Sequence, residues 1–325
     1  MKKTILLTIL GLLISNFSFG QEGEKYFELI KNAWNLYETK DYKLSAEKYS
    51  EAFSAFENKV NTRDRYNAAC SWALAKEIDS SFVQMFKIAE KGNYLNFGHI
   101  TTDSDLDNLH PDKRWSEVLE IVKANKEKAE VNFDKPLVAI LNTIYQEDQG
   151  LRRQISEVEK EYGRESDEMK AHWKLIAEKD SINLIKIQRI LDEHGWLGND
   201  IIGNQGNKTL FLVIQHSDLP IQEKYLPMMR EAVSKGNTRP SGLALLEDRV
   251  ALRQGKKQVY GSQIGRNPET AEFYISPLKD PDNVDKRREE VGLGTLQEYV
   301  SRWDIEWDIE KYKKALPELE ATLQK

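Results

Sequence analysis

Apolar residues recur at steps of three and four positions through most of this 325-residue chain, the spacing of one face of an α-helix. The pattern is clear in residues 137–145, 184–191 and 225–232. Only residues 258–263 and 272–275 have the composition of short extended segments, and we expect them to pair. The predicted fold is mainly α, with an N-terminal helix-turn-helix repeat module, a C-terminal helical bundle and at most one short β-hairpin.

The first twenty residues have the parts of a secretory signal peptide. Lys2 and Lys3 form a basic start, residues 5–14 form a short apolar run, and small residues precede Gly20. That run is too short for a transmembrane helix, and no later stretch is long and apolar enough. We expect cleavage near Gly20–Gln21 and a periplasmic or secreted mature chain without a transmembrane span.

Charge and cysteine content narrow the class of partners. Removing the signal peptide lowers the number of basic residues from 47 to 45 against 53 acidic ones, so the mature formal charge is −8. This balance provides no broad attraction to nucleic acid or anionic lipid, and we expect no nucleic-acid partner. Cys70 is the single cysteine, so it has no partner for an intramolecular disulfide, and its apolar surroundings indicate a buried side chain.

Two short helices joined near residues 40–41 are predicted within residues 26–58. Their small and aromatic residues resemble a tetratricopeptide repeat, a helix-turn-helix unit of about 34 residues. The matching positions are Ala33, Tyr42, Tyr49 and Ala52, with Ser45 where that family usually has alanine. A second unit and a closing helix follow, so the resemblance implies a repeat module over residues 21–130. Such a module binds a peptide or protein partner in its groove.

One acidic segment could be a metal site, and one glycine-rich segment could be a nucleotide site. The sequence DSDLD at residues 103–107 alternates acids as an EF-hand loop does, but Asn108 stands at the sixth position and Arg114 at the twelfth. The glycines of residues 197–209 match neither common nucleotide fingerprint, and we expect that segment to be a loop. We therefore predict no metal site and no cofactor.

Polar residues interrupt strongly apolar sequence between residues 215 and 263. Buried polar groups must be paired to be tolerated, so this cluster is either a structural network or a site. Asp148 and Arg152, four residues apart on a predicted helix, can also pair. The candidate catalytic residues are His216, Asp248 and Arg249, and the candidate ligand-binding residues are Gln215, Gln258, Tyr260, Gln263, Asp148 and Arg152.

Asp248 and Arg249 allow two interpretations. Their predicted helix, residues 241–254, is apolar on two opposite sides and should be buried on both. The arginine could recognise an anion or amide while the acid orients it. Alternatively, the two residues could form an internal ion pair that fixes helix packing, and we favour this structural interpretation slightly.

The ordered motifs GW, QH, LEDR, QVYGSQ, VDKRR and VGL occur between residues 195 and 293. With their surroundings they resemble an uncharacterised family of bacterial helical domains of unknown function. The resemblance covers roughly residues 135–300, implies a helical domain over residues 131–325, and carries no assigned reaction.

These features favour an exported two-domain binding or adaptor protein whose C-terminal domain holds a polar pocket for a small polar ligand or peptide. One alternative is a hydrolase- or transferase-type enzyme in which His216 is the general base and Asp248 or Arg249 assists it. Another is a purely structural interaction module of the cell envelope. The chain lacks a G-x-S-x-G nucleophile motif and an HExxH metal motif, which argues against the enzyme alternative.

Overall fold

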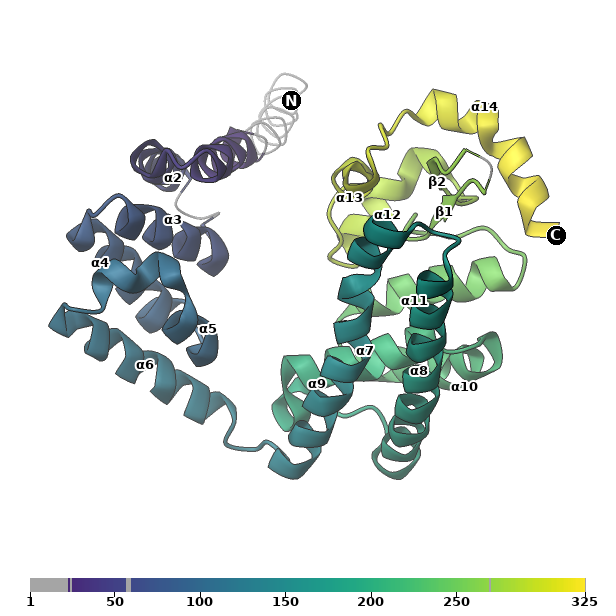
Figure 1. The fold of residues 1–325 in the computed structure, drawn as a ribbon, viewed down its shortest axis with the longest axis horizontal. Coiled ribbons are helices and arrows are strands. Elements are labelled where there is room, and N and C mark those ends of the chain that lie inside the picture. Colours follow the sequence, from purple (N-terminus) through teal and green to yellow (C-terminus); the bar gives the residue numbers. More distant parts are fainter. Residues whose placement is uncertain (1–22, 24, 57–59, 269, 325) are drawn as a thin grey trace, which may run out of the picture. The chain divides into compact units, whose positions relative to one another are not determined.

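The structure is a computed structural model that describes residues 23, 25–56, 60–268 and 270–324. The predicted signal peptide and its cleavage site lie outside these residues. The chain divides into two compact units, Met1–Val131 and Asn132–Lys325 (Figure 1).

The N-terminal unit is built from short helices that follow one another closely (Figure 1). After a helix over residues 25–38, its elements are α2 (Tyr42–Ala55), α3 (Thr62–Leu74), α4 (Ile78–Phe86), the π-helical turn η2 (Lys87–Lys91), α5 (Phe97–Thr102), the 3-10 helix η3 (Ser104–Leu109) and α6 (Lys113–Ala129). The acidic segment that resembles a calcium loop forms η3, and the Asp103 carboxylate accepts a hydrogen bond from the Asp105 amide at its start.

Small and aromatic side chains alternate in the interior of this unit. Ala33, Tyr49 and Ala52 are fully buried in one cluster, where alanines let neighbouring helices approach closely. Ser45 is also fully buried, and its hydroxyl donates to the Ala33 carbonyl at 2.7 Å. A serine is therefore accommodated at that interior position because a backbone acceptor lies beside it.

The C-terminal unit is a bundle of long helices followed by a smaller subregion around two strands (Figure 1). The bundle consists of α7 (Lys135–Tyr162), α8 (Asp167–His194), α9 (Asn199–His216), α10 (Leu219–Ser234) and α11 (Pro240–Arg253). The subregion consists of β1 (Ile264–Arg266), β2 (Phe273–Ile275), η4 (Pro281–Asn283), α12 (Val284–Glu290), α13 (Leu296–Val300), η5 (Ser301–Trp303), α14 (Ile309–Glu320) and η6 (Ala321–Gln324). The chain is thus mainly α with one short β-hairpin, as predicted.

The first strand of the hairpin begins at Ile264, just after the predicted strand over residues 258–263. Ile264–Arg266 pairs antiparallel with Phe273–Ile275, while Gln258 makes only an isolated bridge with Leu278. Backbone amides of residues 259, 260 and 262 are bound by the Asp248 carboxylate instead. Those amides are unavailable for a strand ladder, which needs them as donors.

The glycine- and asparagine-rich segment is helical, so the predicted loop over residues 197–209 is wrong. Helix α9 begins at Asn199 and is kinked at Gly203, where φ is 70°. A Cβ on Gly206 would lie 3.1 Å from a Leu141 methyl group, so this glycine permits close packing of α9 against α7. Helix packing, rather than loop formation, explains the small residue there. None of the described helices is long and apolar enough to cross a membrane.

Candidate functional site

The last residue of α9 is His216, and the chain turns sharply after it. Ser217 is extended, and the Asp218 carboxylate then accepts from the Ile221 amide as the N-cap of α10. Pro220 occupies the first turn of α10, where it cannot leave a helical N–H unsatisfied. The helix-helix corner therefore fixes the backbone that carries His216.

The His216 imidazole is oriented by a buried acid. Its Nδ1 atom lies 2.9 Å from Oδ1 of Asp148, which projects from α7 and is 2 % exposed. Asp148 also accepts from Gln149 at 2.6 Å and from Arg152 at 3.0 Å. Desolvation opposes ionisation of this carboxyl, but its hydrogen bonds with His216 and Gln149 and the charge of Arg152 lower its pKa.

Arg152 extends this network to a third helix. Its guanidinium donates to both carboxylate oxygens of Asp180 on α8, at 2.9 and 2.7 Å. The predicted Asp148–Arg152 pair is confirmed, and Asp180 is an additional partner that sequence reasoning missed. No sequence signal links Arg152 with Asp180, because 28 residues and a helix reversal separate them.

A cavity of about 320 Å³ lies beside this network. His216 lines it, and among described residues no protein group bonds to its Nε2 atom. An imidazole held at Nδ1 by a carboxylate has the arrangement of a general base or of a ligand-binding histidine. The complete lining consists of Asp148, Ala177, Asp180, Ser181, Leu184, Val213, His216, Ser217 and Asp218.

Asp148, Asp180 and His216 could also supply metal ligands, because one ligand atom of each lies within 4.8 Å of the others. Carboxylate and imidazole ligands would suit a divalent cation. However, the Arg152 guanidinium already bonds to both carboxylates and supplies the compensating positive charge. The observed hydrogen bonds therefore describe an organised ion-pair network.

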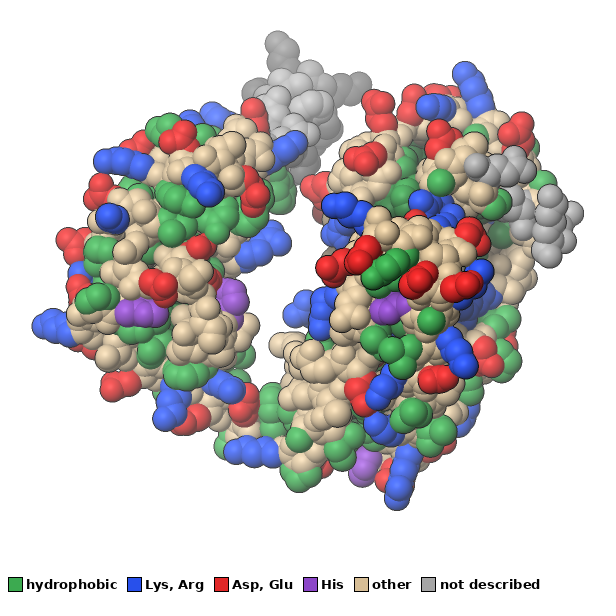
Figure 2. All heavy atoms as spheres, in the orientation of Figure 1, with side chains coloured by type: hydrophobic (Ala, Val, Ile, Leu, Met, Phe, Trp, Pro, Cys, Tyr) green, Lys and Arg blue, Asp and Glu red, His purple; other side chains and the backbone are tan. Residues whose placement is uncertain are grey.

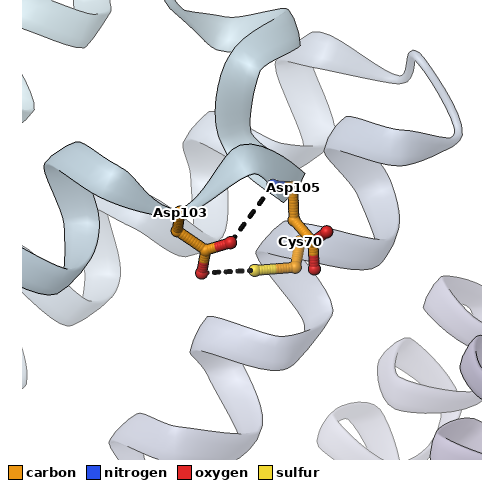
Figure 3. A group of neighbouring side chains, drawn as sticks. All are labelled: Cys70, Asp103 and Asp105. Carbon is orange, nitrogen blue, oxygen red and sulfur yellow. Dashed lines mark hydrogen bonds between the residues drawn. The ribbon is translucent and has the colours of Figure 1, made fainter.

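A similar group in the N-terminal unit comprises Cys70, Asp103 and Asp105 (Figure 3). The Cys70 thiol points to the Asp103 carboxylate at 3.9 Å, and the Tyr66 hydroxyl donates to that carboxylate at 2.8 Å. Burial raises the pKa of the Cys70 thiol, so it stays protonated at neutral pH. Cys70 is buried, and this group is a hydrogen-bonded part of the helix packing.

Asp248 and Arg249 do not pair with each other, and Asp248 does not orient His216. Neighbouring residues on a helix point about 100° apart, so their side chains reach different partners. Asp248 is fully buried and accepts from the amides of Val259 at 2.6 Å and Ser262 at 3.0 Å. Burial raises the pKa of this carboxyl, and the amide donors oppose the rise. Asp248 anchors the segment before β1.

Arg249 instead binds the C-terminal end of α9. Its Nη1 atom donates to the Gln215 carbonyl at 2.8 Å and its Nε atom to Oε1 of Gln263 at 3.0 Å. Arg253 donates to the Ser217 carbonyl, one residue beyond the helix. Burial, reinforced by the charge of Arg253, lowers the pKa of Arg249 to about 10, so it remains a cation at neutral pH. These arginines satisfy helix-end carbonyls and hold the turn that bears His216.

The other predicted ligand-binding residues belong to this supporting structure. The Gln258 side chain donates to the carbonyls of Gln263 and Ser276 and accepts from the Gln263 amide. The Tyr260 carbonyl accepts from Arg288, a 2 % exposed residue that sequence reasoning also missed. Gln215 is buried, and its Oε1 atom has no hydrogen-bond partner. The predicted cluster thus separates into two groups. His216 and Asp148 line the cavity and Arg152 bonds to Asp148, whereas Asp248 and the residues bonded around it form a buried supporting network, the Asp248 scaffold.

Residues 135–310 match a family described as a family of unknown function, DUF6624. The chain belongs to the DUF6624 family. The match begins with α7 and includes His216, Asp148, Arg152, Asp180 and the Asp248 scaffold, so the whole site lies within the DUF6624 region. Neither a curated protein nor a solved structure matches the chain.

Proposed function

We propose that this DUF6624 protein is an exported two-domain binding protein whose C-terminal unit holds a small polar ligand beside His216. The observation that carries the proposal is the His216–Asp148 hydrogen bond at the wall of a cavity of about 320 Å³. That volume lies in the range of small-molecule sites, and hydroxyl, imidazole and carboxylate groups line it beside Leu184 and Val213.

In the same proposal, the N-terminal unit is a tetratricopeptide-type module that binds a peptide or protein. Its succession of short helices and its alanine-filled interior support this role. Trp34 and Leu44 are 43 % and 48 % exposed, and they offer apolar contacts to a partner. The signal peptide proposed from the sequence would place both units outside the cytoplasm.

A ligand screen tests the His216 site. The Tm of the full mature chain is measured with single amino acids, sugars and nucleotides added one at a time. A ligand present at 100 times its Kd raises the free energy of unfolding by about 2.7 kcal/mol. We expect at least one of them to raise the Tm of the wild type and to lose this effect in His216→Ala. His194→Ala, at the exposed end of α8, is the matched control. No shift with any compound, or an equal shift in His216→Ala, would contradict the proposal.

A second candidate is an enzyme in which His216 is the general base and Asp148 orients it. The specific support is the Nδ1 hydrogen bond, which leaves Nε2 without a protein partner among the described residues. If a ligand from the screen is converted, His216→Ala should lower kcat by roughly 10²- to 10⁴-fold. Conversion at the wild-type rate by His216→Ala would exclude this role.

A further inference from the structure

The N-terminal unit contains its own cavity, of about 400 Å³, with a basic lining. It lies between the start of α3 and the π-helical turn η2, and its charged lining residues are Arg65, Lys87 and Lys91. No acidic residue of the described chain lines it. Acidic and basic side chains are interspersed over the visible face of the molecule (Figure 2).

The three cations lack carboxylate partners within the described part of the chain. Arg65 donates from Nη1 to Oε1 of Gln84 at 3.0 Å, and its guanidinium lies 5.1 Å from the centre of the Phe53 ring. These neutral contacts hold the guanidinium in place without cancelling its charge. Among the described residues Lys87 and Lys91 form no ion pair, so three like charges line one space without a described carboxylate partner.

The backbone beside the cavity has a specific and uncommon form. Lys87 and Lys91 are the first and last residues of η2, and π-helical turns occur often at functional sites. A Cβ on Gly92 would lie 2.8 Å from the Ile88 carbonyl oxygen and 3.0 Å from Oγ1 of Thr62. A larger residue would therefore force apart the turn and the start of α3, which together form the cavity wall.

We propose that this cavity binds an anion of the phosphate class. A phosphate group carries up to two negative charges and several acceptor oxygens, so it can accept from the arginine fork and from both ammonium groups. A single carboxylate would compensate only one of the three cations. The cavity is large enough for the organic part of a phosphate monoester as well as for the phosphate group.

Isothermal titration of the full mature chain tests the proposal with two probes, inorganic phosphate and glycerol 2-phosphate. Acetate at equal ionic strength is the control anion, because exposed charges are screened over about 10 Å at 0.1 M salt. We expect saturable binding of phosphate and none of acetate. Tighter binding of glycerol 2-phosphate would identify an ester as the ligand, and tighter binding of inorganic phosphate would identify the free anion.

Substitutions of the lining residues test whether phosphate binds in this cavity. Lys87→Met and Lys91→Met remove one charge each while keeping a good helix former, and each should weaken phosphate binding about tenfold. Arg65→Lys keeps the charge but loses the fork, and it should also weaken binding. Lys123→Met, at an exposed position of α6, is the matched control and should bind as the wild type does.

Circular dichroism and Tm values establish that each variant is folded. Three outcomes would overturn the proposal: no saturable phosphate binding by the wild type, equal binding of acetate, or wild-type affinity in Lys87→Met and Arg65→Lys together.

Discussion

At the scale of single residues, the partner that orients His216 lies far from it in the sequence. Asp248 is closer along the chain, but Asp148, 68 residues away, is the acid that orients the imidazole. The Asp148–Arg152 pair was predictable because four residues bring two side chains onto one helix face. The His216–Asp148 contact was not, because it depends on how α9 packs against α7.

Asp148 should make stability depend on pH in the acid range. Its pKa is lowered in the folded chain, so its contribution is complete above the ordinary aspartate pKa of about 3.9 and is lost as pH falls through the folded value. Urea unfolding at pH 7 should show Asp148→Asn destabilised by about 3 kcal/mol, because a buried ion pair is broken. Between pH 5 and 3 the difference in the free energy of unfolding between Asp148→Asn and the wild type should become smaller.

The control for this experiment is Asp304→Asn. Asp304 is exposed and has a left-handed backbone conformation that asparagine also tolerates, so this variant should follow the wild type at every pH. A stability difference between Asp148→Asn and the wild type that stays constant down to pH 3 would show that the pKa of Asp148 is not lowered in the folded chain.

At the scale of elements, helical periodicity predicted that the region of α7 and α8 is helical but not where these two helices begin and end, and it was least informative where glycine enters a helix. Residues 197–209 have the composition of a loop but form the first part of α9. Gly206 has the small size that packing against α7 requires, whereas Gly203 supplies the positive φ of the kink. Composition cannot distinguish these uses of glycine from a flexible connection.

Gly203→Ala tests this account of the kink. Its φ of 70° disfavours an L-residue, and the new Cβ would lie 3.0 Å from the Phe133 ring. We expect a loss of about 2 kcal/mol in the free energy of unfolding, measured with urea. Gly150→Ala is the matched control, because Gly150 lies inside α7 with only a flexible arginine end near the new methyl group. It should be stabilising, by up to about 1 kcal/mol. Equal stability of the two variants would show that the kink is not strained.

At the scale of the whole molecule, each cluster of buried apolar residues lies within one of the two units. The clusters around Tyr49 and Met85 are drawn entirely from the first unit, and those around Ile214 and Leu278 entirely from the second. A domain with its own hydrophobic core can fold alone. The His216 cavity is lined by the second unit only, and the basic cavity by the first only.

Fragments 21–131 and 132–325 should therefore each fold independently. We expect each to give a helical circular dichroism spectrum and a cooperative thermal transition, because neither loses residues from its core. The fragment that begins at Asn132 should keep any ligand response of the His216 cavity. A non-cooperative transition for either fragment would show that its core depends on the other unit.

The sequence by itself determined the helical class, the short hairpin, the Asp148–Arg152 pair and the resemblance to a family of unknown function. These follow from local rules, because helix periodicity and i,i+4 spacing act over a few residues. Tertiary structure alone decided that Asp148 orients His216, that Asp248 binds backbone amides, and that Arg249 caps α9. Each of these contacts joins residues on different elements, and a side chain's partner there is set by helix packing and burial, which no local pattern encodes.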